Sequence, residues 1–151
     1  MNDSNSTLEK TQVRDIMSSV VEVCTPLTPV NEIAQQMKEH QVGAIPVLDP
    51  ISRKPLGMVT DRDIVVNAVG AGRRCSKATA AEVMTTPAHC MPIDSTLESC
   101  AEAMAENQVR RLPLVNRKGA CVGVVSLGDL VKRIDPQLAA DVLLKIVNEK
   151  S

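Results

Sequence analysis

Two carboxylates, each preceded three residues earlier by a hydroxyl, are the side chains best suited to chemistry in this sequence. Thr60 and Asp63 belong to the segment GMVTDRD at 57–63, and Ser126 and Asp129 to the segment GVVSLGD at 123–129. Both segments read Gly-x-x-Thr/Ser-x-x-Asp. A carboxylate accepts two hydrogen bonds, so it can hold the adjacent 2′- and 3′-hydroxyls of a ribose, and a helix N-terminus beside it favours phosphate. The pattern therefore indicates binding of a nucleoside or nucleotide.

Helix capping is a simpler role for the same residues. Each segment follows an apolar run and opens another with helical spacing, so each lies where a strand passes into a helix. Thr60 or Ser126 would then be the N-cap, and Asp63 or Asp129 would lie at the third helical position, near the positive end of the helix dipole. Both roles stay open at this point.

Composition narrows the class of protein. The chain of 151 residues has no Phe, Tyr or Trp and a formal net charge of −1. A bound ring must therefore contact aliphatic side chains and backbone, and base stacking with single-stranded nucleic acid is disfavoured. The small net charge argues against a large basic surface for nucleic acid. Because no apolar run approaches ~20 residues and the N-terminus lacks an apolar signal core, we expect a cytoplasmic protein without membrane contact.

The cysteines and the catalytic motifs give no reason to expect an enzyme or a metalloprotein. The five cysteines are odd in number and form no Cys-x-x-Cys, which argues against a disulfide framework or a zinc finger. His89 beside Cys90 is the only close pair of metal-type ligands, and ordinary strand residues are the favoured interpretation. A phosphate-binding loop, a His-Glu-x-x-His motif and a recognisable nucleophile with its base are all missing. We therefore expect no catalytic activity and no metal site.

The motifs lie at matching positions of an internal repeat. The two halves align with an offset of 67 residues up to Asp49 and Asn116, and of 66 after that point. Each half is predicted as strand-helix-strand-strand-helix. We expect a disordered tail at 1–12, repeat 1 at 13–69, a linker at 70–79, repeat 2 at 80–134 and a C-terminal helix at 135–151. A repeat of about 55 residues has too little interior to fold alone, so the two should pack together with pseudo-two-fold symmetry, with the motifs in clefts between them.

Start signals and periodicity predict the individual elements. Thr28 should cap a helix that runs to His40, and Ser95 should cap the corresponding helix of repeat 2. Strands are expected at 20–24, 44–48, 56–59, 89–91, 111–115 and 120–125, and helices after the motifs at 61–69 and 127–134. The apolar faces of the three longest predicted helices are Val30, Ile33, Ala34 and Met37; Leu97, Cys100, Ala101 and Met104; and Leu138, Val142, Leu143, Ile146 and Val147.

The repeat, the order of elements, the strand residues Pro46 and Pro113 and the two motifs together resemble a tandem of CBS domains (cystathionine-β-synthase-like domains). The resemblance covers about residues 13 to 134 and implies an α/β (α+β) fold of two CBS repeats. It leaves only short tails, as in stand-alone CBS-pair proteins. Such proteins bind adenosine-containing ligands, namely AMP, ADP, ATP, S-adenosylmethionine or NAD(H), in the clefts between their repeats.

The resemblance also implies site residues. Asp63 and Asp129 would bind ribose hydroxyls, Thr60 and Ser126 would lie near ribose and phosphate, and one residue after each motif glycine would touch the base. These base contacts are Met58 and Val124. The other residues expected to form the walls of the two clefts are Val42, Gly43, Ala44, Val109, Arg110, Arg111, Ser18, Val21, Thr85, Thr86 and Ala88. The resemblance further implies that Asp129 and Ser126 face Ser18 and 42–44, whereas Asp63 and Thr60 face Thr86 and 109–111.

The two clefts should differ in their affinity for anions. Arg110 and Arg111 of repeat 2 replace Gly43 and Ala44 of repeat 1, and arginine holds phosphate by bidentate, charge-assisted bonds. Arg62 at a helix N-terminus is a further phosphate ligand, and Gly128 takes its place in repeat 2. A solvated arginine pair near a turn is the alternative interpretation.

We therefore expect a non-catalytic sensor that binds an adenine nucleotide, with no cofactor required, and acts on an unknown protein partner. The resemblance implies a homodimer. The alternative is a ligand-free interaction module in which the motifs only cap helices. A metal or redox sensor through the cysteines and His89 is a further alternative.

Overall fold

The computed structural model describes residues 11–19 and 22–148, and the chain forms two compact units. Unit 1 comprises residues 1–19, 90–117 and 122–151, and unit 2 comprises residues 20–89 and 118–121. The first residues of each repeat therefore belong to the unit that holds most of the other repeat. The mixture of helices and strands agrees with the predicted α+β class.

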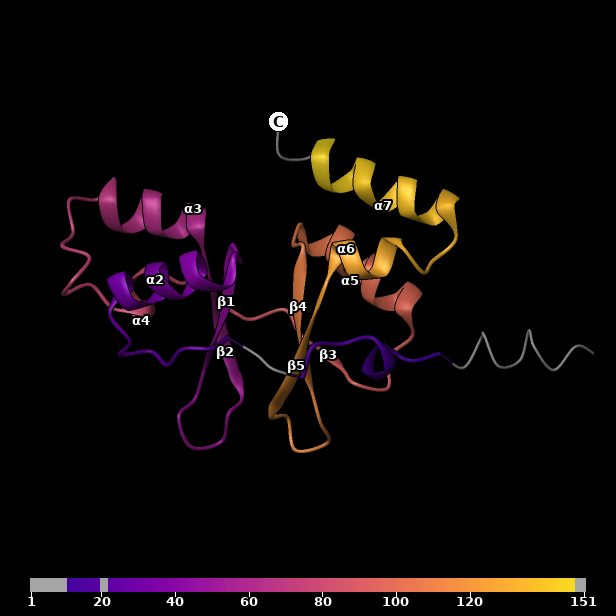
Figure 1. Ribbon diagram of the computed structural model, residues 1–151, viewed down its shortest axis with the longest axis horizontal. Coiled ribbons are helices and arrows are strands. Elements are labelled where there is room, and N and C mark those ends of the chain that lie inside the picture. The colour runs from indigo at the N-terminus through magenta and orange to yellow at the C-terminus, as the bar shows by residue number, and fades with distance from the viewer. Residues whose placement is uncertain (1–10, 20–21, 149–151) are drawn as a thin grey trace, which may run out of the picture. The chain divides into compact units, whose positions relative to one another are not determined.

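Unit 2 is built on a hairpin covered by helices (Figure 1). Its elements are α2 (Val30–His40), β1 (Ala44–Leu48), β2 (Pro55–Thr60), α3 (Asp61–Asp63), η2 (Ile64–Val69) and α4 (Ala80–Val83). Strands β1 and β2 are antiparallel, and their register sets Ala44 opposite Thr60. Ile33, Ile45 and Val59 are fully buried in the core. The pairing places the start of β1 beside the motif hydroxyl at the end of β2.

Unit 1 has a three-stranded sheet and one additional helix. Its elements are the 3-10 helix η1 (Val13–Asp15), β3 (Met91–Pro92), α5 (Leu97–Asn107), β4 (Arg111–Val115), β5 (Cys121–Ser126), α6 (Leu127–Val131) and α7 (Pro136–Asn148). The strand order is β3-β4-β5, and β3 runs parallel to β4. The backbone N–H of Val13 donates to the carbonyl of Ser95 at 2.8 Å, which attaches η1 to this unit.

The N-caps predicted for the helices α2 and α5, Thr28 and Ser95, are each wrong by one residue. Helix α2 has Pro29 as its N-cap, and the Thr28 hydroxyl instead accepts from the backbone N–H of Thr25 at 3.0 Å. Carbonyl groups of the linker accept from the first N–H groups of α2, with distances of 2.8 Å from Val30 N to Ala78 O and 2.9 Å from Asn31 N to Cys75 O. These bonds do the work of a side-chain cap.

The corresponding helix α5 is capped by Thr96 rather than Ser95. The Thr96 hydroxyl accepts from the backbone N–H of Ser99 at 3.1 Å. The Ser95 carbonyl is engaged by Val13 of η1 and the Ser95 N–H by Pro92. Ser95 thus belongs to the preceding turn, which shifts the start of the helix by one residue.

Three further elements differ from the prediction. The strand expected at 89–91 is observed at Met91–Pro92, and the helix expected at 127–134 ends at Val131. The segment expected as one helix at 61–69 has a short α-helical part followed by the π-helix η2, in which Gly70 N bonds Val65 O at 2.7 Å. The strand expected at 20–24 falls partly on residues outside those described, as does most of the tail expected at 1–12.

Helix α7 covers a face of α5 and contacts α6 (Figure 1). Its residues Ala139, Val142 and Ile146 are buried. The Gln108 side-chain amide donates to the carbonyl of Lys145 in α7 at 3.1 Å. Leu143 and Val147 were predicted to face inward but are 42% and 57% exposed. The buried face of the helix is instead formed by Ala139, Val142 and Ile146.

The part of the chain that the structure describes contains no helix that is long and apolar enough to cross a membrane.

Candidate functional site

The first motif forms a complete capping box in unit 2. The Thr60 hydroxyl accepts from the backbone N–H of Asp63 at 3.1 Å, and the Asp63 carboxylate accepts from the backbone N–H of Thr60 at 2.9 Å. The capping role predicted for this pair is therefore confirmed. Because an ionised carboxylate offers about four acceptor positions, capping leaves the half-buried Asp63 with acceptor capacity for a ligand.

Thr85 brings a second hydroxyl to the same carboxylate. Its Oγ1 donates to Asp63, at 3.1 Å to Oδ1 and 3.4 Å to Oδ2. The backbone of Thr85 pairs with Met58, with N···O distances of 3.0 and 2.9 Å. The Thr85 hydroxyl therefore occupies part of the acceptor capacity of the Asp63 carboxylate.

The second motif repeats the arrangement in unit 1 with looser geometry. The Ser126 hydroxyl accepts from Asp129 N at 3.1 Å, and the Asp129 carboxylate accepts from Ser126 N at 3.4 Å. Ser18, the counterpart of Thr85, pairs through its backbone with Val124 at 3.0 and 3.2 Å. Within the described residues, the Ser18 side chain makes no bond to Asp129. The Asp129 carboxylate therefore has one competitor fewer than Asp63.

The motif glycines are required by the chain that crosses them. A Cβ on Gly57 would lie 2.7 Å from the carbonyl oxygen of Thr85, and a Cβ on Gly123 would lie 3.0 Å from that of Ser18. Both distances are shorter than a normal van der Waals contact. Glycine at the start of each motif thus allows the beginning of a repeat to approach the strand that ends in the motif hydroxyl.

The segments before β1 and β4 are attached to the motifs by equivalent bonds. Asp61 N donates to Gly43 O at 2.9 Å in unit 2, and Leu127 N donates to Arg110 O at 2.8 Å in unit 1. Each unit thus gathers its own motif and its own segment, 42–44 or 109–111. The expectation that each motif faces the segment of the other repeat stays a prediction.

Side chains at these equivalent positions differ in charge. In unit 2 the carboxylate of Asp61 accepts from Arg62 N at 2.8 Å and lies beside Gly43, where an added Cβ would be 3.1 Å from Asp61 Oδ2. In unit 1 the neutral Leu127 takes the place of Asp61. Asp61 was not among the residues predicted from the sequence, although its position directly after the motif threonine could have indicated it.

Two arginines lie beside the second motif in unit 1. Arg110 is exposed and Arg111 is half-buried, and Arg111 Nε is buried without a hydrogen-bond acceptor among the described residues. An unpaired buried donor costs free energy, and a bound oxyanion would reduce that cost. Arg62 in unit 2 is exposed.

The remaining predicted wall residues differ in their exposure to solvent. Met58, Ala44, Val42, Val109 and Ala88 are half-buried, whereas Val124 is buried and Thr86 is exposed. Thr85 rather than Thr86 is the threonine that bonds Asp63. Val21 lies outside the described residues.

The cysteines differ in environment. Burial raises the pKa of the Cys24 thiol to about 12, and burial together with the charge of Glu98 raises the pKa of Cys100 to about 11. Cys90 is exposed, and partial burial of its thiol still raises its pKa. Residues 11–19 and 22–148 contain no group of three or more His, Cys, Asp or Glu side chains placed to hold a metal ion. Cys24 and Cys100 are therefore protonated core residues at neutral pH.

Comparison with known proteins gives a consistent family. The family model for the CBS domain matches residues 13–70 and 80–136. The chain is 37% identical over 138 residues to the CBS domain-containing protein YhcV of Bacillus subtilis, covering 91% of this chain and 96% of the relative.

Two solved structures extend this comparison. Hypoxic Response Protein I, determined with two coordinated zinc ions, has a TM-score of 0.75 at 32% identity and covers 83% of this chain and 100% of its own. CBSX2 in complex with AMP has a TM-score of 0.69 at 25% identity and covers 80% of this chain and 93% of its own.

Proposed function

This chain belongs to the CBS domain family, and we propose that it is a non-catalytic regulatory protein that binds an adenine nucleotide through Asp63 and Asp129. The family match covers both repeats, and stand-alone CBS-pair proteins generally have a regulatory rather than a catalytic role. AMP is the preferred ligand of the proposal because the similar protein CBSX2 has been determined in complex with AMP. ADP, ATP, S-adenosylmethionine and NAD(H) are the competing ligands.

The observation that carries the proposal is the environment of the Asp63 carboxylate. It is half-buried, fixed by the backbone N–H of Thr60 and contacted by the hydroxyl of Thr85. Two ribose hydroxyls would replace one threonine hydroxyl, so binding exchanges similar hydrogen bonds and needs little rearrangement. The half-buried Met58 would supply aliphatic contact for the base at the first motif, in a chain without aromatic residues, whereas Val124 at the second motif is buried.

Thermal unfolding with a ligand panel tests the proposal. The panel contains AMP, ADP, ATP, S-adenosylmethionine, NADH and GTP. Unfolding is monitored by circular dichroism or calorimetry, because the chain has no Trp or Tyr whose fluorescence could report it. A ligand at ~100 times its Kd adds about 2.7 kcal/mol, which raises Tm by several degrees. We expect a shift with adenine ligands alone, lost in the double variant Asp63→Ala, Asp129→Ala. Equal shifts with GTP, or none with any ligand, would contradict the proposal.

A ligand-free interaction module is the second candidate, and exposed apolar side chains favour it. Val65, Val66 and Val69 of η2 are 60%, 48% and 62% exposed, and Leu144 of α7 is 58% exposed. The three valines are near neighbours on η2, and such a group of exposed apolar side chains suits contact with a second chain; we propose a homodimer in either case. Light scattering of the purified protein tests the dimer, and substituting the three valines by Ser should yield monomers.

A further inference from the structure

We propose that the linker between the two repeats carries an anion site, separate from the motifs, that takes a dianionic phosphoryl group. A hollow of about 280 Å³ lies at the surface of unit 2 and is lined by Arg73, Arg74, Lys77, Ala78 and Glu82. Three positive side chains and one carboxylate line it. The whole chain has 17 Lys and Arg against 18 Asp and Glu, so this excess of positive charge is local.

The linker backbone is held in place by hydrogen bonds. Arg73 N donates to Ala68 O at 2.9 Å, and Lys77 N and Ala78 N both donate to Arg74 O, at 3.0 and 2.7 Å. The second pair of bonds closes a turn that brings Arg74 and Lys77 close together. On the other side, the carbonyls of Cys75 and Ala78 accept from the first turn of α2. The cations therefore project from a fixed turn, which reduces the entropy lost when they hold a ligand.

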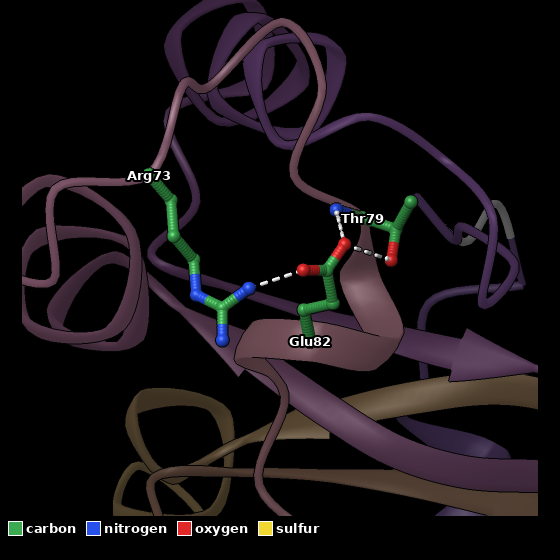
Figure 2. Close-up of polar contacts among 3 residues, drawn as sticks. All are labelled: Arg73, Thr79 and Glu82. Carbon is green, nitrogen blue, oxygen red and sulfur yellow. Dashed lines mark hydrogen bonds and ion pairs between the residues drawn. The ribbon is translucent and has the colours of Figure 1, made fainter.

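The one carboxylate in the hollow is already engaged. Figure 2 shows Glu82 with one oxygen toward Arg73 and the other toward Thr79. Glu82 Oε1 accepts from both Thr79 N and Thr79 Oγ1 at 3.1 Å, and Glu82 Oε2 pairs with the Arg73 guanidinium. Glu82 is thus fixed by the capping of α4 and by a single arginine.

Arg74 and Lys77 are left without a counter-ion. Both are exposed, and neither forms an ion pair within the described part of the chain. The guanidinium of Arg73 has five N–H donors and uses one nitrogen for Glu82. A tetrahedral dianion in the hollow would meet the two unpaired cations and the remaining donors of Arg73. Because the site is open to solvent, we expect weak, millimolar affinity that decreases as salt rises.

This site does not rest on the proposed function, because none of its residues belongs to either motif. The probes are inorganic phosphate and ribose 5-phosphate, titrated at constant ionic strength into the full ¹⁵N-labelled chain, with amide chemical shifts as the readout. We expect saturable shifts of the amides at 73–82. Response to both probes assigns the site to phosphoryl groups in general, and response to phosphate alone assigns it to the free ion.

Two variants should move the affinity in opposite directions. Arg74→Gln with Lys77→Gln should abolish saturation at 73–82, whereas Glu82→Gln should tighten phosphate binding several-fold because it removes the one carboxylate among the described residues that line the hollow. Lys132→Gln with Arg133→Gln, a pair of exposed cations in unit 1, is the matched control and should leave the titration unchanged. Circular dichroism verifies that each variant is folded. Shifts at 73–82 that never saturate, or that persist in the Arg74, Lys77 variant, would overturn the proposal.

Discussion

The two repeats share a motif but differ in what covers the helix beside it. In unit 1, Ala101 and Ala105 of α5 are 0% and 4% exposed, and α7 packs against this helix. The same positions of α2 in unit 2 are Ala34 and Lys38, and both are exposed. Small residues allow two helices to approach closely, whereas a lysine keeps a face solvated. Both repeats thus have the motif and its strand pairing, whereas only the repeat in unit 1 has the additional helix α7 packed on it.

The charged groups beside the two motifs also differ between the units. Unit 1 presents Arg110 and Arg111 beside its motif, and unit 2 presents Gly43, Ala44 and the carboxylate of Asp61. The capping geometry itself is nearly equal in both units. One backbone design thus supports two chemically different surroundings, which is the pattern expected if the two copies have different ligand preferences.

The largest expected effect tests the difference in packing between α5 and α2. Ala101→Lys places a charged side chain into the hydrophobic core to which both α5 and α7 contribute, so we expect a loss of more than about 3 kcal/mol in unfolding free energy. Ala34→Lys is the matched control in unit 2 and should change stability by less than about 0.5 kcal/mol. Urea unfolding followed by circular dichroism measures both. Equal losses would show that the two faces are equally buried.

Next in size are the motif glycines, which the two units share. Gly57→Ala and Gly123→Ala should each cost about 1–3 kcal/mol, because the added methyl group meets a crossing backbone carbonyl. Gly128→Ala is the control, since its Cβ would meet only Ser126 Oγ at 3.8 Å, and it should stabilise the helix by up to about 1 kcal/mol. The same unfolding assay applies. Tolerance of alanine at 57 and 123 would remove the packing reason for the motif glycine.

A smaller effect separates the two carboxylates. Asp63→Ala removes the capping bond and the contact from Thr85, whereas Asp129→Ala removes a capping bond alone. Each loss of a cap should cost about 1 kcal/mol, and Asp63→Ala should cost about 0.5–1 kcal/mol more. A double-mutant cycle with Thr85→Val isolates this difference. Coupling of Thr85 to Asp129, or none to Asp63, would contradict the geometry.

The smallest effect concerns acid stability of the β1–β2 loop. Backbone N–H groups of Ser52 and Ile51 lower the pKa of Asp49, and the corresponding residue in repeat 2 is the neutral Asn116. Because the folded-state pKa of Asp49 is lowered, its ionised carboxylate stabilises the folded protein above the unfolded-state pKa of 3.8. This stabilisation is lost as the pH falls through the folded-state pKa. Asp49→Asn should therefore flatten the stability profile slightly below about pH 4. Unchanged acid unfolding would show that these bonds persist when the carboxyl group is protonated.

Local patterns predicted the elements whose determinants are local. The motif capping boxes, strands 44–48 and 111–115 and the C-terminal helix follow from hydroxyl, carboxylate and periodicity signals within a few residues. The start of α2 could not be predicted in this way, because its cap consists of carbonyls from Cys75 and Ala78, more than forty residues further along. Ala34 was predicted inward from the helical spacing of its apolar neighbours, yet it is exposed, whereas the equivalent Ala101 is buried in a unit that has the additional helix α7.

The site was predicted to the same extent. The sequence identified both motif carboxylates and their hydroxyls, which the structure brings within hydrogen-bond distance. Thr85 and Thr86 were both predicted as wall residues, and the structure shows that Thr85 is the one that bonds Asp63, whereas Asp61 was not predicted. Which ligand group each unit holds remains a prediction, because it depends on chemistry that the motif alone does not specify.

Isothermal titration of AMP into the wild-type chain, Asp63→Asn and Asp129→Asn tests the central claim most directly. Asparagine keeps an oxygen that can accept from the N-cap backbone N–H, so the fold is retained while the charged partner of the ribose hydroxyls is lost. We predict saturable AMP binding to the wild type, a clear loss of affinity or of one site in at least one variant, and unchanged far-ultraviolet circular dichroism. AMP binding of wild-type affinity and stoichiometry in both variants would contradict the claim that these carboxylates hold the ligand.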